Sequence, residues 1–257
     1  MTNPSNHPAS RLAPHPTLQD YYQDGSRRAF ISDIFDKTAH HYDWIIRAMS
    51  LGSGDWYRKQ ALVRAGLAQG MDVLDVATGT GPVAQAAREM VGESGSVTGL
   101  DRSINMLRNN RMRSTLPMVQ SDAARLPFPD QSFDFLSMGY ALRHVDDLGM
   151  TFAEYHRVLR PGGKVLLLEL TRPDSRIGTG VARFYLRTIV PRVARLGCSS
   201  KDAQLLMEYF WDTVEQCVRP AAILEALTTA GFAEVKRGRQ IGVFSEYSAL
   251  RAAMPAA

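Results

Sequence analysis

The residues with the clearest chemical potential lie in one stretch, DVLDVATGTGPVAQAA, which spans Asp72–Ala87. Its start is an apolar run of the kind that a buried parallel strand needs, and Pro82, followed by apolar residues at helical spacing, predicts the first turn of a helix. Gly79 and Gly81 lie between the two, where they allow a sharp turn and a close approach of the backbone to a ligand. The stretch therefore predicts a nucleotide-type binding loop.

Two classes of nucleotide ligand fit these glycines. Gly79, Gly81 and Ala84 satisfy the dinucleotide pattern G-x-G-x-x-G/A, and Asp101 follows Gly81 by twenty residues. Asp75 distinguishes the two classes, because a carboxylate just before the loop would repel a pyrophosphate and attract a cationic ligand. S-adenosylmethionine carries an ammonium and a sulfonium group, so we favour this methyl donor. A nicotinamide dinucleotide bound to an oxidoreductase is the alternative.

Two further acids follow predicted strands. Asp101 ends the strand expected over Ser96–Asp101, and Asp122 follows the strand expected over Pro117–Gln120. Because the carboxyl ends of parallel strands meet at one edge of a sheet, we expect Asp75, Asp101 and Asp122 to lie along one ligand. Asp101 would bind ribose hydroxyls and Asp122 the adenine amino group. Each acid taken alone could instead cap a helix or a turn.

The alternation of strand and helix patterns predicts a doubly wound, Rossmann-like α/β sheet. Residues 29–257 would form this domain, with helices ahead of the first strand and a helical insertion at about 172–219 that roofs the pocket. Residues 1–28 are rich in Pro, Asn, Ser and His and are expected to be a mobile arm. The later strands are expected over Phe133–Gly139, Val165–Leu170, Phe232–Arg237 and Gly242–Ser248, the last two as an antiparallel edge. A helix from about Asp147 is expected to end at the breaker Arg160–Gly163, before the second of these strands.

Composition narrows the class of protein. The chain has 257 residues, 45% of them hydrophobic and 22% charged, which excludes disordered and fibrous classes. A net charge of +4 is too diffuse to predict nucleic-acid binding, but it suits an anionic substrate or contact with a membrane surface. Cys198 and Cys217 make neither a disulfide framework nor a metal site. With no leader pattern and no apolar run long enough for a membrane span, we expect a cytoplasmic protein, and a homodimer is compatible with the sequence.

In its sequence motifs the chain resembles the ubiquinone/menaquinone biosynthesis C-methyltransferases, a family of class I S-adenosylmethionine-dependent methyltransferases. The likeness covers roughly Phe35 to Phe232. In chain order it rests on FDKTAHHYD, SLG followed by Trp56, LDVATGTG, GLD-x-S-x-x-ML, DAARLPFPDQSFD and RVLRPGG.

The resemblance implies a seven-stranded sheet with six parallel strands and a last strand that is antiparallel. It also implies that Tyr42 reaches the amino-acid end of the donor, and that the acceptor is a prenylated hydroquinone or similar phenol, methylated on a ring carbon. No metal is implied. The remaining residues assigned to the donor are Asp75, Thr78, Gly79, Gly81, Asp101, Arg102, Met106, Asp122, Ala123 and Gly139.

The chain departs from the family where the acceptor is expected. The family segment FGLRN reads here as YALRH, residues 140–144, which keeps the arginine as Arg143 and replaces the asparagine by His144. Arg143 could stabilise a phenolate or hold a water that accepts the proton, and His144 could act as a base near neutral pH. A capping or core histidine is the alternative for His144. An O- or N-methyltransferase of specialised metabolism, or a non-catalytic protein that binds the donor, remain alternatives for the chain.

Overall fold

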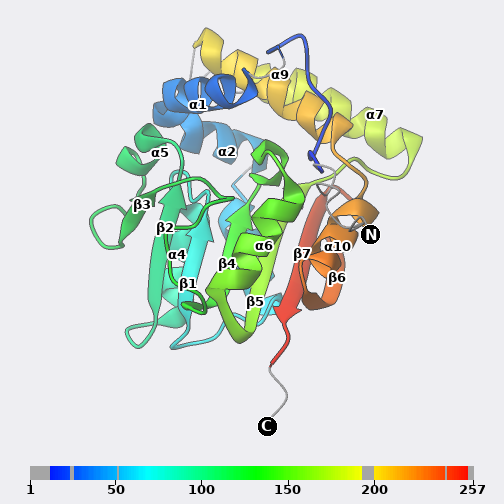
Figure 1. Ribbon diagram of the computed structural model, residues 1–257. Helices are drawn as coiled ribbons and strands as arrows, with labels where there is room; N and C mark the ends of the chain where they lie inside the picture. Colours follow the sequence, from blue (N-terminus) through cyan, green and yellow to red (C-terminus); the bar gives the residue numbers. More distant parts are fainter. Residues whose placement is uncertain (1–11, 24–25, 51, 193–199, 241, 254–257) are drawn as a thin grey trace, which may run out of the picture.

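A twisted seven-stranded sheet forms the centre of the computed structural model, which describes residues 12–23, 26–50, 52–192, 200–240 and 242–253 (Figure 1). The strand order is β3-β2-β1-β4-β5-β7-β6, and β7 pairs antiparallel with both of its neighbours while the other pairs are parallel. The predicted Rossmann-like class is confirmed, including its antiparallel last strand. The strands are β1 (Asp72–Val76), β2 (Ser96–Asp101), β3 (Met118–Gln120), β4 (Phe133–Gly139), β5 (Leu159–Leu170), β6 (Phe232–Gln240) and β7 (Phe244–Arg251).

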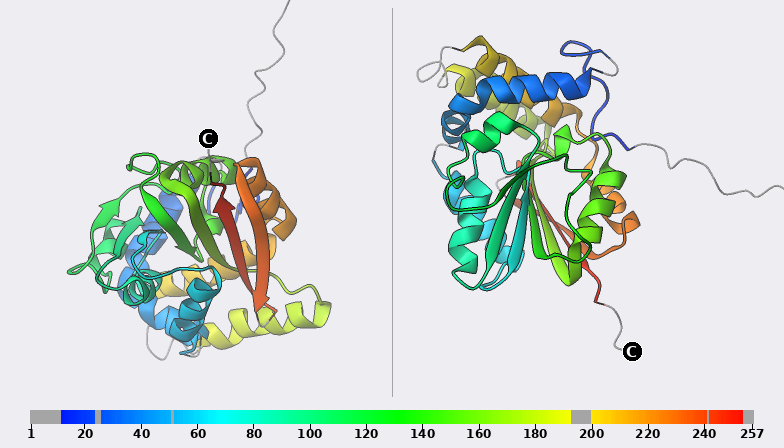
Figure 2. Two further views of the ribbon diagram at one scale, coloured as in Figure 1. Left: turned by 90° about the horizontal axis from the view of Figure 1, so that it is seen from below. Right: turned by 60° about the vertical axis from the view of Figure 1, so that its left-hand side comes forward.

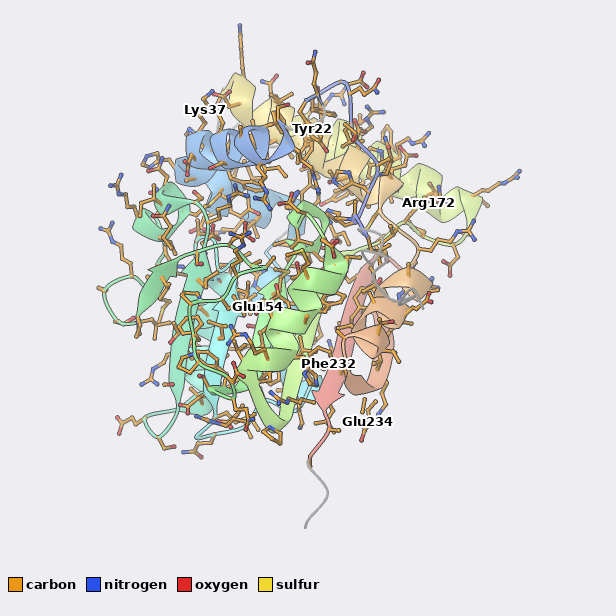
Figure 3. All side chains as sticks on the ribbon, in the orientation of Figure 1. Tyr22, Lys37, Glu154, Arg172, Phe232 and Glu234 are labelled. Carbon is orange, nitrogen blue, oxygen red and sulfur yellow. The ribbon has the colours of Figure 1, made fainter. Side chains whose placement is uncertain are left out.

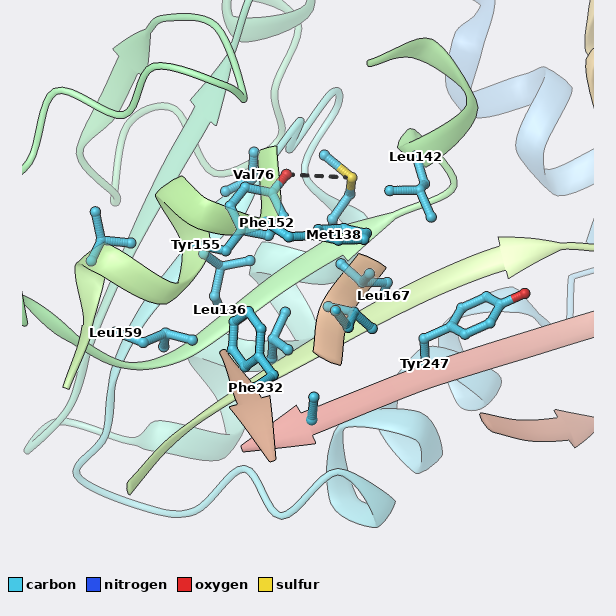
Figure 4. Close-up of a cluster of buried hydrophobic side chains, with 14 of the residues drawn as sticks. Val76, Leu136, Met138, Leu142, Phe152, Tyr155, Leu159, Leu167, Phe232 and Tyr247 are labelled. Carbon is cyan, nitrogen blue, oxygen red and sulfur yellow. Dashed lines mark hydrogen bonds between the residues drawn. The ribbon is translucent and has the colours of Figure 1, made fainter. Parts of the chain in front are cut away.

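Alternate residues of each central strand enter two different cores. On β1, Leu74 and Val76 pack against α6 (Leu148–Val158) and α10 (Pro220–Thr229), and Figure 4 shows this core around Tyr155. Val73 packs on the other face, against α3 (Gly54–Arg64) and α4 (Pro82–Val91). Asp75 shares the face of Val73 by the same alternation, so it ends the strand on the side of the glycine loop.

Helices from three separate parts of the chain lie above the carboxyl ends of the strands (Figures 1 and 2). Ile34 of α1, Ile45 of α2 and Leu206 of α9 share one apolar cluster, which confirms the predicted helical roof. The bounds are α1 (Arg27–Thr38), α2 (Tyr42–Ser50), α5 (Ile104–Arg108), α7 (Arg176–Phe184) with the π-helical turn η3 (Tyr185–Ile189), and α9 (Lys201–Gln216).

A 3-10 turn over Ala39–His41 separates α1 from α2. One local expectation was wrong. The stretch Arg160–Gly163 does not interrupt β5: Leu159 already pairs with Phe133, and the register then shifts so that Lys164 pairs with Phe135. Gly162 takes a φ of +83°, so the extra residues form a bulge within one strand.

The predicted mobile arm also needs correction. Leu18 and Tyr22 are buried, at 5% and 6% exposure, in the apolar cluster of the roof; Figure 3 labels Tyr22. The carbonyl of Leu12 accepts a hydrogen bond from the Leu148 backbone N–H (2.9 Å), and that of Pro14 accepts one from Val218 (2.7 Å). Burial of these apolar side chains makes residues 12–22 part of the folded domain, while residues 1–11 lie outside the described part of the chain.

We therefore expect Leu18→Ala to lower the free energy of unfolding by about 2–4 kcal/mol, because the substitution leaves a cavity in the roof. Urea denaturation followed by circular dichroism measures this loss. Gln19→Ala is the matched control, since its side chain is exposed in the same segment. Equal stability of Leu18→Ala and the wild type would show that the segment does not pack in solution.

Candidate active site

A cavity of about 860 Å³ lies between the carboxyl ends of the central strands and the helical roof. Its volume is in the range of small-molecule and cofactor sites. The floor is polar and comes from the ends of β1, β2 and β4, whereas the roof contributes apolar side chains. The position is the one expected for a ligand of an open parallel sheet.

The two loop glycines are required for different physical reasons. Both have positive φ, +55° at Gly79 and +90° at Gly81. A side chain on Gly81 would come within 2.4 Å of the Asn110 Oδ1 atom, so this glycine permits close packing, and it does not line the cavity. A side chain on Gly79 would meet no protein atom within 4 Å, and Gly79 lines the cavity. Gly79 therefore leaves space that a ligand can fill.

Asp75 presents a buried carboxylate oxygen to the cavity. The residue is 1% exposed, and its Oδ1 atom accepts a hydrogen bond from the Ser137 hydroxyl (2.6 Å). Its Oδ2 atom and the Thr78 hydroxyl have no hydrogen-bond partner among the described residues. Burial raises the pKa of Asp75 to about 6. Because buried polar atoms are usually paired, these two atoms are available to a ligand.

Asp101 joins the loop to the next helix. Its Oδ2 atom accepts a hydrogen bond from the Gly79 N–H (2.8 Å), and its Oδ1 atom accepts one from the Ser103 N–H (2.8 Å). Burial raises the pKa of Asp101 to about 6. The carboxylate thus caps backbone groups and also lines the cavity, so the capping and ligand-binding hypotheses are compatible.

Asp122, like Asp101, both accepts a backbone hydrogen bond and lines the cavity. Its Oδ1 atom accepts a hydrogen bond from the Ala124 N–H (2.9 Å), and its Oδ2 atom lies 3.7 Å from an Arg102 guanidinium nitrogen. Other predicted donor residues that line the cavity are Tyr42, Arg102, Met106, Ala123 and Gly139. The structure therefore brings the predicted donor residues together, apart from Gly81.

His144 lines the cavity with a neutral ring. It packs edge-on against Phe35, with ring centroids 5.1 Å apart, and is stacked on Tyr209 at 5.6 Å. Both ring nitrogens are buried and have no partner among the described residues. Burial, reinforced by the charge of Arg143, lowers the pKa of His144 well below its usual value. The imidazole is therefore neutral at pH 7 and has a nitrogen that can accept a hydrogen bond.

Arg143 lies behind the cavity wall. It is fully buried, and its Nη1 atom donates to the Glu169 carboxylate (2.6 Å). Its guanidinium carbon is 4.3 Å from the ring centroid of Phe210, and Phe210, not Arg143, lines the cavity. The structure separates the two predicted catalytic residues, with His144 in the cavity and Arg143 one layer away.

Arg58 was not identified from the sequence. It lies on α3, lines the cavity and is 5% exposed. Its Nη2 atom donates to the Asp55 carboxylate (2.7 Å), while its Nε atom has no partner among the described residues. In the sequence, the only sign of such a role was that this basic residue lies in a helical segment ahead of the first strand. The helix period alone did not show that this arginine faces inward.

The described residues contain neither a metal-binding cluster nor a membrane-spanning helix. Within the described ranges, no cluster of His, Cys, Asp and Glu could hold a metal ion. No helix in that same part of the chain is long and apolar enough to cross a membrane. Cys217 is a free thiol whose pKa is raised to about 12 by burial, and Cys198 lies outside the described residues.

The chain is similar to methyltransferases over most of its length. The model of the ubiE/COQ5 methyltransferase family matches residues 23–249. A demethylmenaquinone methyltransferase of Mycobacterium sp. (strain JLS) is 31% identical, over 86% of this chain and 94% of the relative. One of Staphylococcus aureus (strain MRSA252) is 34% identical, over 69% of this chain and 73% of the relative.

Solved structures share the fold at low sequence identity. A methyltransferase dependent on S-adenosylmethionine from Thermotoga maritima has a TM-score of 0.61 at 19% identity, covering 86% of this chain and 99% of its own. The [4+2]-cyclase SpnF has a TM-score of 0.63 at 15% identity, covering 95% of this chain and 100% of its own. Because one neighbour is named as a cyclase, the fold alone does not decide the reaction.

The buried carboxylate of Asp75 predicts a pH effect on stability without added ligand. Its pKa of about 6 in the folded chain exceeds the ordinary 3.8, so the folded chain binds more protons between these values. Its stabilising contribution is therefore present at low pH and lost as the pH rises through 6. Relative to wild type, we expect Asp75→Asn to gain roughly 1–3 kcal/mol of unfolding free energy between about pH 4 and pH 7.

Urea denaturation at several pH values measures this difference. The control is Asp20→Asn, whose side chain is exposed. Parallel stability curves for Asp75→Asn and wild type would contradict the raised pKa.

Proposed function

This chain belongs to the ubiE/COQ5 methyltransferase family and is an S-adenosylmethionine-dependent methyltransferase, and from that premise we propose that it methylates a ring carbon of a quinol. The observation that carries the proposal is a single cavity with two chemically different ends. Buried carboxylates and the open loop at Gly79 form one end, and apolar roof side chains form the other. The first suits the cationic donor and the second an apolar aromatic acceptor.

We assign the polar end to the donor. The unpaired oxygen of Asp75 would accept a hydrogen bond from its ammonium group, with Tyr42 near the same end. Asp101 would accept from ribose hydroxyls with its remaining lone pairs, and Asp122 from the adenine amino group. Arg102, Met106, Ala123 and Gly139 would surround the donor. Gly81 would act indirectly, by allowing the loop to pack on Asn110.

The apolar end favours an aromatic or prenylated acceptor. The roof lining includes Ile31, Ile45, Ile46, Met207, Phe210 and Val214. These side chains exclude water and offer few hydrogen bonds, so they would hold a ring or tail by apolar contact. A relative of Pseudoalteromonas translucida (strain TAC 125), 28% identical, is named as a ubiquinone/menaquinone biosynthesis C-methyltransferase, which supports methylation on carbon over the O- and N-methylation alternatives.

The chemistry requires a nucleophilic ring carbon beside the donor, whose activated methyl group needs little further catalysis. A ring carbon becomes nucleophilic when the neighbouring hydroxyl ionises, and the pKa of a free phenol is about 10. We propose that Arg58 stabilises the resulting oxyanion, because it is a buried cation that lines the cavity. His144 would accept the hydroxyl proton with its neutral ring and hold it only transiently, because burial and Arg143 lower the pKa of the ring and favour its release. A carbon–carbon bond would form as the methyl–sulfur bond of the donor breaks and its electron pair stays on the sulfur of the demethylated product. The hydrogen on that ring carbon would leave as a proton to solvent, and His144 would return its proton to the ring oxygen.

Arg143 has a different proposed role. Its guanidinium packs on Phe210 and pairs with Glu169, so it would position this wall and the adjacent His144 without touching the acceptor.

Three broader proposals concern the chain as a whole: residues 172–219 form a roof insertion within one domain, the chain acts in the cytoplasm, and it forms a homodimer.

We expect the purified chain to transfer an isotopically labelled methyl group from S-adenosylmethionine to reduced demethylmenaquinone with a short tail. NMR of the product should place the label on a ring carbon. Asp75→Asn should lose donor affinity, measured by calorimetry, because the ammonium loses its anionic partner; Asp20→Asn is the control. A label found only on oxygen would favour the O-methyltransferase alternative, and absence of donor binding would overturn the assignment of the cavity.

The proposed roles of Arg58 and His144 predict different effects of pH on the kcat of their variants. We expect Arg58→Gln and His144→Phe each to lower kcat by about 100-fold at neutral pH. As the pH approaches about 10, the phenol ionises unaided, so His144→Phe should recover while Arg58→Gln should not. Arg58→Lys should restore part of the activity. Lys59→Gln is the neighbouring control, because its side chain is exposed. Equal recovery of both variants would contradict the assignment of the proton acceptor to His144.

A further inference from the structure

Helix α7 carries an apolar stripe on its solvent side. Ile177, Val181 and Phe184, here called the α7 stripe, follow one another by four and three residues and so share one face of the helix. They are 82%, 64% and 60% exposed. Ala182, on another face, is buried in a cluster with Trp211 of α9. A contiguous apolar stripe that faces solvent marks an interaction surface.

Arginines surround the stripe. Arg172 and Arg176 are exposed and have no ion-pair partner among the described carboxylates; Figure 3 shows Arg172 beside α7. Arg183 and Arg187 pair with Glu215 and Asp212, and their side chains remain 52% and 49% exposed. An amphipathic helix with large apolar residues on one face and arginines beside them has the composition of a helix that lies in a lipid interface.

The stripe also borders the active-site cavity. Gly178, Val181 and Tyr185 of this helical segment line it. Trp56 of α3 lines the same cavity and is 67% exposed. Exposed apolar side chains therefore continue from the outer surface into the apolar end of the cavity. An acceptor dissolved in a lipid layer against α7 would reach that end without crossing water.

We propose that the α7 stripe, with Arg172 and Arg176, docks on the surface of an anionic lipid bilayer. Ile177 and Phe184 would enter the boundary between headgroups and acyl chains, while the arginine side chains extend to the lipid phosphates. A second copy of this chain fits the surface less well, because a two-fold contact would bring the same arginines together. Docking itself does not depend on the function proposed above; only the identity of the acceptor as a quinol rests on it.

The test is partition of the full chain onto vesicles, measured by sedimentation. We expect binding to vesicles of equimolar phosphatidylcholine and phosphatidylglycerol and weaker binding to phosphatidylcholine alone. High salt should lower the first toward the level of the second. Ile177→Ser/Phe184→Ser should reduce the partition coefficient by at least about tenfold, since two apolar side chains no longer leave water. Arg172→Gln/Arg176→Gln should weaken binding to the anionic vesicles only.

The matched controls carry the same types of substitution at exposed positions outside α7. Val63→Ser/Met150→Ser changes two side chains that are each 55% exposed, and Arg108→Gln/Arg113→Gln changes two exposed arginines near α5. Both controls should bind like wild type. Wild-type binding by Ile177→Ser/Phe184→Ser, or no binding by the wild type, would overturn the proposal. So would a dimer in solution that the Ser variant converts to a monomer, because the stripe would then be occupied by a second copy.

An activity assay separates this proposal from the proposed function. Neither Ile177 nor Phe184 lines the cavity, so their Ser variant should methylate a quinol without a tail at the wild-type rate and a vesicle-embedded quinol more slowly. If the wild type methylates neither quinol, the proposed acceptor fails, while vesicle partition still decides the role of α7. Equal rates of the variant and the wild type on the vesicle-embedded quinol would contradict delivery through this surface.

Discussion

The site depends on two carboxylates that are removed from water at the carboxyl ends of neighbouring strands. Burial raises the pKa of both Asp75 and Asp101, which shows that each charge is costly in the fold without a ligand. Asp101 is stabilised by backbone N–H groups of Gly79 and Ser103, so it holds the loop and α5 in place. Asp75 is only partly satisfied, by Ser137. A cationic donor would supply the missing partner of Asp75, which couples ligand binding to this buried charge.

The roof is held in place by apolar packing, whereas the floor depends on buried carboxylates. Tyr22, Ile34 and Tyr209, which are far apart in the chain, meet in one apolar cluster above the floor. That cluster sets the position of His144, whose ring lies between Phe35 and Tyr209. An Arg27 guanidinium nitrogen also donates to the Arg143 carbonyl (2.8 Å), which ties the first helix to the segment that follows β4. The apolar end of the cavity therefore depends on packing between remote segments, whereas the polar end depends on the glycine loop and the ends of neighbouring strands.

These two halves explain how a common fold can serve different reactions. Neighbours at under 20% identity share the sheet, yet one of them is named as a cyclase. The floor is built by backbone geometry that any such sheet provides. The roof is built by apolar side chains from α1, α2 and α9, and under the proposals above the roof and α7 would select the acceptor and the surface from which it enters.

Much of the fold and the donor end was determined by the sequence alone, because both depend on local patterns. Apolar runs predicted β2 and β4 with their observed bounds, Ser103 and Asp147 cap helices as their residue types suggest, and the acids at strand ends lie at one cavity. Helix and strand periods and glycine loops act over a few residues, so they can be read without a partner segment.

Only the tertiary structure decided which side chains face the cavity from the roof. Arg143 and His144 are adjacent in sequence, yet the ion pair with Glu169 draws Arg143 behind Phe210 and leaves His144 inside. Arg58 faces inward because of how α3 packs on the sheet, and residues 12–22 are ordered by contact with α9 and the loop after it. Each of these outcomes depends on contacts between residues distant in the chain, which no local pattern of a single sequence encodes.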